Sequence, residues 1–399
     1  MKKFYLLFLL ILLACSEKNE SLSESSDKVI SINLLESFST RGKIKASLFL
    51  ENIEYIPLET RPESFFTRAP RITIQDDSII VARSFRKIVL FNLKNGEFIR
   101  EIGHYGEDPE AYVSSHEKLK GVHKPGVVYA RGKKGLIGYS IKTGKKVDFI
   151  ADPINTDNYQ SSEISQYVFK DKNTVSAYFA NGSGRQKLRL INYSRQGEIL
   201  GLFENPNSYD NDPYFTFWRP NDYGFYHFNK ELFFFETFVD TVFQVGEKEL
   251  EPHIVFNAGD RSPPYEKMEY LAKKENADKA LEYFYVNNLL ETENSIFYKF
   301  DFQDDEYYGF FNKEEQQNYV SDLSELNGSG FMNDVSEEFV SFKPKLAYGD
   351  KIIGLLSVEE VKEWFKNNRE LAKKLPKKLK DLQKLEMEDN PILMIGELK

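Results

Sequence analysis

The chain has 399 residues, a formal net charge of −9 and a pI of about 5.4. This acidic balance argues against nucleic acid as a partner, because phosphate binding needs a clustered positive surface. The chain has a single cysteine, so an intramolecular disulfide is excluded and stability must come from packing. Aromatic residues make up 15% of the chain, which suits half-buried β-strands.

The N-terminus predicts a lipoprotein signal peptide over residues 1–14. Two lysines follow the initial methionine, and residues 4–14 form an apolar run that is too short to cross a bilayer as a mature helix. The sequence LLAC (12–15) resembles a bacterial lipobox, in which the cysteine after the cleavage site is acylated. We therefore predict that Cys15 carries a lipid anchor. The alternatives are an ordinary signal peptide or an unmodified, buried cysteine.

Residues 15–30 predict the acylated cysteine and a flexible tether. The tract after Cys15, SEKNESLSESSDK, is almost entirely polar and cannot bury enough apolar area to offset the entropy of ordering. We expect an outer-membrane lipoprotein that is anchored to the membrane through the lipid on Cys15. The periplasmic face and the cell surface both stay open as its location.

From about residue 45 onward the chain predicts short strands separated by turn residues. Residues 71–103 form two hairpins, and the second turns at Asn95-Gly96, a strong hairpin signal. This segment therefore predicts a four-stranded antiparallel meander. Comparable units follow at residues 126–150, 166–203, 224–259 and 294–321.

These units recur at a spacing of roughly 40 to 60 residues, which is typical of a β-propeller with one sheet per repeat. The predicted fold class is all-β: a six-bladed β-propeller of four-stranded antiparallel blades over residues 31–399. An open sandwich of so many strands would expose long edges, whereas a closed ring hides them. We expect a strand near 49–60 to close the last blade together with residues 339–357 and 390–399.

Two helical insertions are predicted, at about 265–286 and 358–375. The second has apolar residues at helical spacing and is followed by Pro376. The first falls between the fourth and fifth repeats, and the second interrupts the last blade. We expect both to pack on the outside of the ring.

Several segments in this order resemble the Bacteroidetes six-bladed β-propeller lipoproteins, which are relatives of NHL-type propellers. The segments are YIPLET (55–60), FNLKNGEFIREIGHYGEDPEAY (91–112), DTVFQV (240–245) and NPILMI (390–395). The resemblance implies the propeller fold and the lipoprotein location, but no established activity. The family usually has G-x-G-P-x-E-Y after the first blade, and residues 106–112 lack its second glycine.

The sequence contains neither H-E-x-x-H, G-x-S-x-G nor a Walker-type loop. His104, His116 and His123 fall in one segment and could supply metal ligands, but histidines in a polar loop are more commonly solvated. We therefore predict no metal site and no cofactor. Asp304, Asp305 and Glu306 are neighbours in a turn, so they cannot face one another across a substrate, and we predict a solvated turn.

The segment YDNDPYFTFWRPNDYGFYHF (209–228) is the strongest candidate for ligand binding. Tyr214, Trp218, Arg219 and Tyr223 combine aromatic faces, which stack on sugar rings, with an arginine that is typical of protein-binding hot spots. The alternative is a long connection that packs down on the blades.

The predicted function is non-catalytic binding of a glycan, a peptide or a partner protein of an envelope uptake system. The second hypothesis is a lyase or hydrolase with acid and base residues at the channel mouth, and the sequence assigns no catalytic residue to it. The third is a structural role. An enzyme would bring titratable groups with shifted pKa together, a binding protein would show an exposed aromatic platform, and a scaffold would show an apolar patch.

Overall fold

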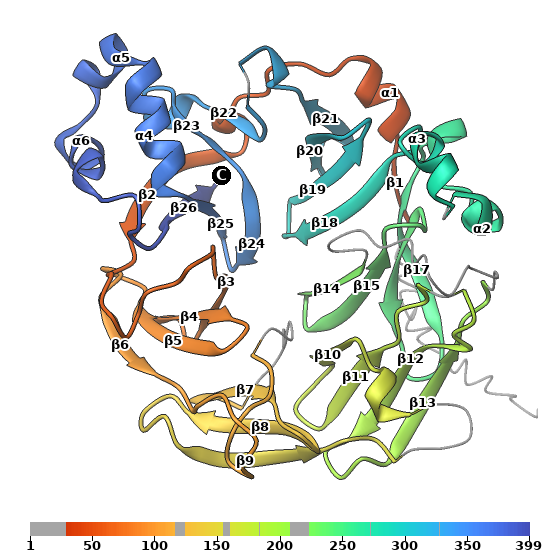
Figure 1. Ribbon diagram of the computed structural model, residues 1–399. Coiled ribbons are helices and arrows are strands. Elements are labelled where there is room, and N and C mark those ends of the chain that lie inside the picture. The colour runs from red at the N-terminus through yellow and green to blue at the C-terminus, as the bar shows by residue number, and fades with distance from the viewer. Residues whose placement is uncertain are drawn as a thin grey trace, which may run out of the picture.

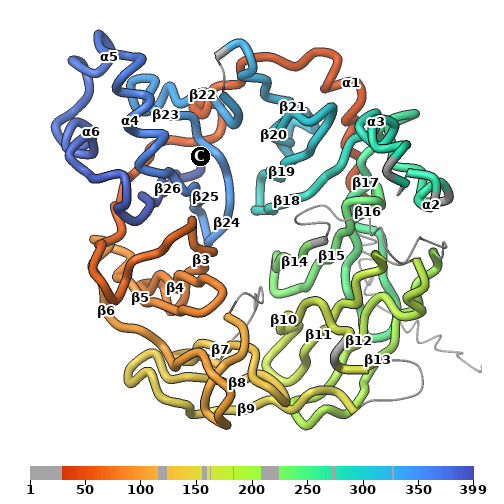
Figure 2. The backbone as a smooth tube through the Cα atoms, in the orientation of Figure 1, coloured from red at the N-terminus to blue at the C-terminus, as the bar shows by residue number. Residues whose placement is uncertain are grey.

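Six β-sheets form a closed ring in the computed structural model, which is the arrangement of a six-bladed β-propeller (Figures 1 and 2). The structure describes residues 29–115, 124–154, 160–182, 184–207, 223–271, 273–326 and 328–399. The predicted fold class is confirmed. In each full blade the first strand lies nearest the ring centre and the fourth lies at the rim.

Blades 1, 3 and 5 are four-stranded antiparallel meanders. Blade 1 has β3 (Arg71–Gln75), β4 (Ile79–Ser84), β5 (Lys87–Asn92) and β6 (Phe98–Glu101). Blade 3 has β10 (Gln166–Phe169), β11 (Thr174–Tyr178), β12 (Leu188–Ser194) and β13 (Ile199–Glu204). Blade 5 has β18 (Tyr285–Glu291), β19 (Ser295–Phe302), β20 (Asp305–Asn312) and β21 (Gln317–Ser321). The meander predicted for residues 71–103 is therefore confirmed.

Blades 2 and 4 depart from four strands within the described residues. Blade 2 has β7 (Val127–Arg131), β8 (Gly135–Ser140) and β9 (Lys146–Ala151). On the inner side of β7, Ser114 forms a bridge with Arg131, just before residues 116–123, which are not described. Blade 4 has β14 (Tyr223–Phe228), β15 (Glu231–Glu236), β16 (Thr241–Val245) and β17 (Leu250–Phe256), and β1 (Ile30–Ile32) adds a fifth, parallel strand beside β17.

Blade 6 takes strands from both ends of the described chain. Its order is β24 (Pro344–Tyr348), β25 (Lys351–Leu356), β26 (Ile392–Leu398) and β2 (Leu50–Pro57), with β2 antiparallel to β26 at the rim. Residues 339–342 lie outside this sheet, because β23 (Phe339–Phe342) pairs with β22 (Phe331–Asn333). A single ladder thus joins segments that are separated by more than 300 positions in the sequence.

The predicted helix over 265–286 is wrong in its extent. The segment holds two single-turn helices, α2 (Met268–Leu271) and α3 (Ala277–Ala280), each preceded by a 3₁₀ turn, and β18 already begins at Tyr285. Residues 284–286 are buried as part of blade 5, and this tertiary packing overrides their place in the helical pattern.

The predicted helix over 358–375 is present but divided and longer. It comprises α4 (Val358–Asn367), α5 (Arg369–Lys374) and α6 (Lys377–Asp381), which lie at the outer edge of blade 6 (Figure 1). Ser357 and Glu360 form a capping box at the start of α4. The short helix α1 (Leu34–Ser39) was not predicted.

Aromatic side chains fill the spaces between blades. Phe49, just before β2, lies 4.9 Å from the ring centroids of Phe297, Phe310 and Phe331 and so joins blade 5 to blade 6. Edge-to-face and tilted pairs of this kind add to the hydrophobic gain from burial. The high aromatic content therefore serves the core.

The antiparallel order of the blades places two kinds of turn on opposite faces of the ring. One face, here called the loop face, carries the turns between second and third strands and the links between blades, including residues 85–86, 303–304 and 357–391. The opposite face carries the turns between first and second strands, such as residues 76–78 and 349–350. All the helices α4 to α6 belong to the loop face, because they connect β25 to β26.

Candidate functional site

The ligand-binding residues expected from the sequence fall almost entirely outside the described residues. Tyr214, Trp218 and Arg219 lie in the range 208–222, and Cys15 lies in the range 1–28, neither of which the structure describes. Tyr223 is the first residue of β14, where its backbone pairs with Glu236, and its side chain is not described. Their roles stay predictions.

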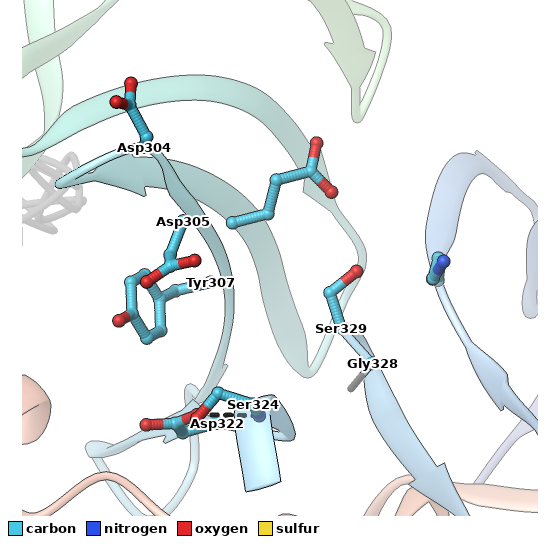
Figure 3. A pocket seen from close by; sticks show the side chains of 9 residues that line it. Asp304, Asp305, Tyr307, Asp322, Ser324, Gly328 and Ser329 are labelled. Carbon is cyan, nitrogen blue, oxygen red and sulfur yellow. Dashed lines mark hydrogen bonds between the residues drawn. The ribbon is translucent and has the colours of Figure 1, made fainter. Parts of the chain in front are cut away.

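A hollow of about 420 Å³ opens on the loop face between blade 5 and the link that leads to blade 6. The carboxylates of Asp304, Asp305 and Glu306 come from blade 5, whereas the Asp322 carboxylate and the serine hydroxyls come from the link after β21 (Figure 3). The residues that line it are Asp304, Asp305, Glu306, Tyr307, Asp322, Ser324, Gly328, Ser329 and Lys343.

The turn between β19 and β20 presents the first carboxylates of the hollow. Gln303 and Asp304 both have positive φ, +53° and +66°, the geometry of a two-residue type I′ turn that suits the twist of a hairpin. Asp304 and Asp305 are exposed at this turn, so the sequence-based prediction of a solvated turn is correct. What the sequence did not indicate is that the turn borders a hollow.

Asp322 is held in place by its own loop and by the N-terminal segment. Its Oδ1 accepts hydrogen bonds from the backbone N–H and the hydroxyl of Ser324 at 3.0 and 2.6 Å, and its Oδ2 lies 2.9 Å from Nε of Arg41. Burial alone would raise the pKa of Asp322, but these hydrogen bonds and the guanidinium charge keep it below its ordinary value.

Two lysines form ion pairs at or beside the hollow. Lys299 forms an ion pair with Glu306, and Lys343 lies 2.8 Å from a carboxylate oxygen of Glu360 on α4. Burial opposes the ionised form of Glu306, but the hydrogen bond and charge of Lys299 lower its pKa. The hollow therefore offers ionised acceptors and hydroxyls, an arrangement that suits hydrogen bonding to a polar ligand.

One charged cluster around a buried carboxylate joins two neighbouring blades. Glu291, whose side chain is fully buried, lies 2.9 Å from Nε2 of His253 and 2.7 Å from Nζ of Lys313, and it accepts a hydrogen bond from the Tyr226 hydroxyl. This cluster links blade 4 to blade 5. Because the Glu291 side chain is fully buried and is paired with His253 and Lys313, we assign this cluster a structural role.

The described residues contain no group of three or more His, Cys, Asp or Glu side chains arranged to hold a metal ion. Of the three histidines considered as ligands, His104 forms an exposed pair with Asp108 at 2.6 Å, and His116 and His123 lie outside the described residues. Among the helices that the structure describes, none is long and apolar enough to span a membrane.

A family model described as a domain of unknown function (DUF4934) matches residues 29–397, which is nearly the whole chain. The chain belongs to the DUF4934 family. The match covers all six blades and ends one residue before the end of β26. No curated protein matches this DUF4934 chain.

The DUF4934 chain is similar in structure to several solved proteins, although the sequence identity is low. A candidate exported protein from Bacteroides fragilis aligns with a TM-score of 0.66 and 16% identity, covering 93% of this chain and 99% of its own. An oxidoreductase-like protein (glucose dehydrogenase) from Thermus thermophilus aligns with a TM-score of 0.39 and 12% identity, covering 86% and 100%. The first likeness supports the fold alone, and the second is too weak to bear on this chain.

Proposed function

We propose that this protein is an envelope-anchored recognition protein that binds a glycan, a peptide or a partner protein of an uptake system on its loop face. The observation that carries the proposal is the hollow beside blade 5. The pKa values of two of its carboxylates, Glu306 and Asp322, are lowered, which favours the ionised form of both groups. A general acid needs the opposite shift, so these groups suit ligand binding better than proton transfer.

The proposed anchor is a lipid on Cys15 in the outer membrane, as in the Bacteroidetes six-bladed β-propeller lipoproteins that the sequence resembles. The B. fragilis structural neighbour is itself described as a candidate exported protein, which agrees with export. Labelling cells with an alkyne-bearing fatty acid tests this anchor. The full-length protein should take up the label and fractionate with the outer membrane, and Cys15→Ser should do neither.

Binding is tested with a soluble form, residues 29–399, against a panel of glycans and peptides. Asp304→Asn combined with Asp305→Asn removes two exposed charges from the hollow without touching the core. Asp350→Asn, in an exposed turn on the opposite face, is the matched control. Saturable binding that weakens at least tenfold in the double variant, and not in the control, supports the hollow as the site.

The residues Tyr214, Trp218, Arg219 and Tyr223 are a separate proposal for ligand contacts. Trp218→Ala tests them in the same titrations. Binding that is lost in Trp218→Ala but kept in the Asp304/Asp305 variant would move the site to residues 209–228. Chemical turnover of a panel member would instead favour the lyase or hydrolase hypothesis. No binding to any member would contradict the proposed function.

A further inference from the structure

Two exposed aromatic rings and an arginine lie together on the loop face where blade 1 meets blade 2. Phe85 and Arg86 form the turn between β4 and β5, and Tyr105 lies in the link after β6. The side chains of Phe85 and Tyr105 are 48% and 41% exposed, and their ring centroids are 5.9 Å apart at an interplanar angle of 46°. Single exposed apolar residues are common on protein surfaces, whereas contiguous exposed apolar surface more often marks an interaction site.

The guanidinium of Arg86 belongs to the same surface. It lies 4.9 Å from the ring centroid of Tyr105 and 5.9 Å from that of Phe85. Among the described residues it forms no ion pair, whereas its neighbours His104 and Lys133 pair with Asp108 and Glu107. The cation that stacks on the rings is therefore left available to an anionic ligand.

The backbone beneath the rings is held by buried groups. Tyr112 is fully buried and donates its hydroxyl to the Arg86 carbonyl at 3.1 Å. Its backbone N–H donates to the His104 carbonyl at 3.0 Å, and its carbonyl accepts from the N–H of Gly106 at 3.1 Å. These bonds tie the link that carries Tyr105 to the turn that carries Phe85 and Arg86. A surface fixed in this way loses little entropy when it binds.

We propose that Phe85, Arg86 and Tyr105 form a second binding site on the loop face, separate from the hollow beside blade 5, for an acidic saccharide; the inference rests on the proposed recognition function and adds this site to it. The C–H face of a sugar ring stacks across Phe85 and Tyr105, and a carboxylate on that sugar pairs with the guanidinium of Arg86 in a charge-assisted contact. The observations favour a saccharide over a folded protein partner. Two rings flanked by exposed charged pairs make a patch far smaller than the about 800 Å² per partner of a stable protein interface.

The test is isothermal titration calorimetry of the soluble form, residues 29–399, with three ligands. They are trigalacturonate, its neutral counterpart galactotriose, and an acidic peptide of three glutamates. The wild type should bind trigalacturonate at least tenfold more tightly than galactotriose, and this preference should weaken with added salt. Arg86→Gln should abolish the preference, and Tyr105→Ala should weaken binding of both saccharides. Arg369→Gln, an exposed arginine in α5 on the same face, is the matched control and should bind as the wild type does.

The outcomes separate this inference from the proposed function. Equal binding by wild type and Arg86→Gln, with loss in the Asp304/Asp305 variant, overturns the inference but keeps the proposed function. Binding of the glutamate peptide alone through Arg86 also overturns the saccharide assignment. Failure of every saccharide and peptide to bind contradicts both. An unchanged thermal midpoint for Arg86→Gln and Tyr105→Ala confirms that lost binding does not reflect lost folding.

Discussion

Replacing Gly96 by alanine should loosen the junction between the first and last blades. Gly96 lies in the turn between β5 and β6 with φ of +73°, a region that costs a residue with a Cβ about 1–2 kcal/mol. A Cβ at this position would lie 2.0 Å from the carbonyl oxygen of Pro57, the last residue of β2. The Gly96 carbonyl also accepts a hydrogen bond from the N–H of Glu59 at 2.9 Å.

The overlap cannot be relieved by rotating a side chain, because both atoms in contact are fixed to backbone. Blade 1 must move away from β2, and the bond to Glu59, which contributes about 1 kcal/mol, must lengthen. Together with the backbone strain and displaced packing, we expect Gly96→Ala to lower the free energy of unfolding by about 3–5 kcal/mol. Gly144 and Gly197 form the same contact between later blades, accepting from the N–H of Gly103 at 3.0 Å and of Ile154 at 3.1 Å.

Gly349→Ala is the matched control. Gly349 also has positive φ, +57°, but a Cβ there would meet no atom within 4 Å. Its substitution should cost only the backbone strain, about 1–2 kcal/mol. Urea denaturation of the soluble form, followed by tryptophan fluorescence and far-UV circular dichroism, measures both variants. If Gly96→Ala unfolds at the same urea concentration as Gly349→Ala, the reasoning about the blade junction is refuted.

Three further predictions address the buried cluster around Glu291, the N-terminal cap of α4 and the link after β6 that carries Tyr105. Glu291→Gln should destabilise the soluble form by about 3 kcal/mol at pH 7 in urea titrations, because His253 and Lys313 lose their buried partner. Burial alone would raise the pKa of Glu291, but His253 and Lys313 lower it below the ordinary value of 4.5. The ionised carboxylate therefore adds to the free energy of unfolding above pH 4.5, and this stabilisation is lost as the pH falls through the lowered folded-state pKa. Glu291→Gln should lose less stability than the wild type on acidification, and equal pH profiles would contradict this. Ser357→Ala removes the cap of α4 and should cost about 1 kcal/mol, with Ser357→Thr nearly neutral in the same assay. Tyr112→Phe should cost about 1 kcal/mol and raise amide exchange of residues 104–106, and unchanged exchange would show that the hydroxyl does not hold the link.

Most of the fold could be predicted from the pattern of strands and turns in the sequence. Alternating apolar residues and turns such as Asn95-Gly96 specify hairpins locally, so the meander over 71–103 could be predicted from its own residues. The helix over 265–286 could not be bounded in this way. Phe284 and Tyr285 fit a helical face in the sequence but are buried in blade 5, and only the neighbouring strands decide between the two.

The candidate site could be predicted only in part. The acidic turn at Asp304 is visible in the sequence, whereas Asp322 and Lys343, on the other sides of the hollow, come from the link that follows blade 5. Likewise, Phe85 and Tyr105 are twenty positions apart and meet because a buried hydroxyl from Tyr112 ties their loops together. No local pattern signals such meetings, since they depend on how consecutive blades pack.

Hydrogen exchange of the soluble form, with and without the tightest-binding member of the glycan and peptide panel, tests the central claim most directly. If the loop face is the recognition surface, ligand should slow exchange at residues 85–86, 104–106, 303–305 or 322–326. The turns at 76–78 and 349–350 on the opposite face should exchange as in the free protein. Protection confined to those opposite turns, or binding without protection on the loop face, would contradict the account.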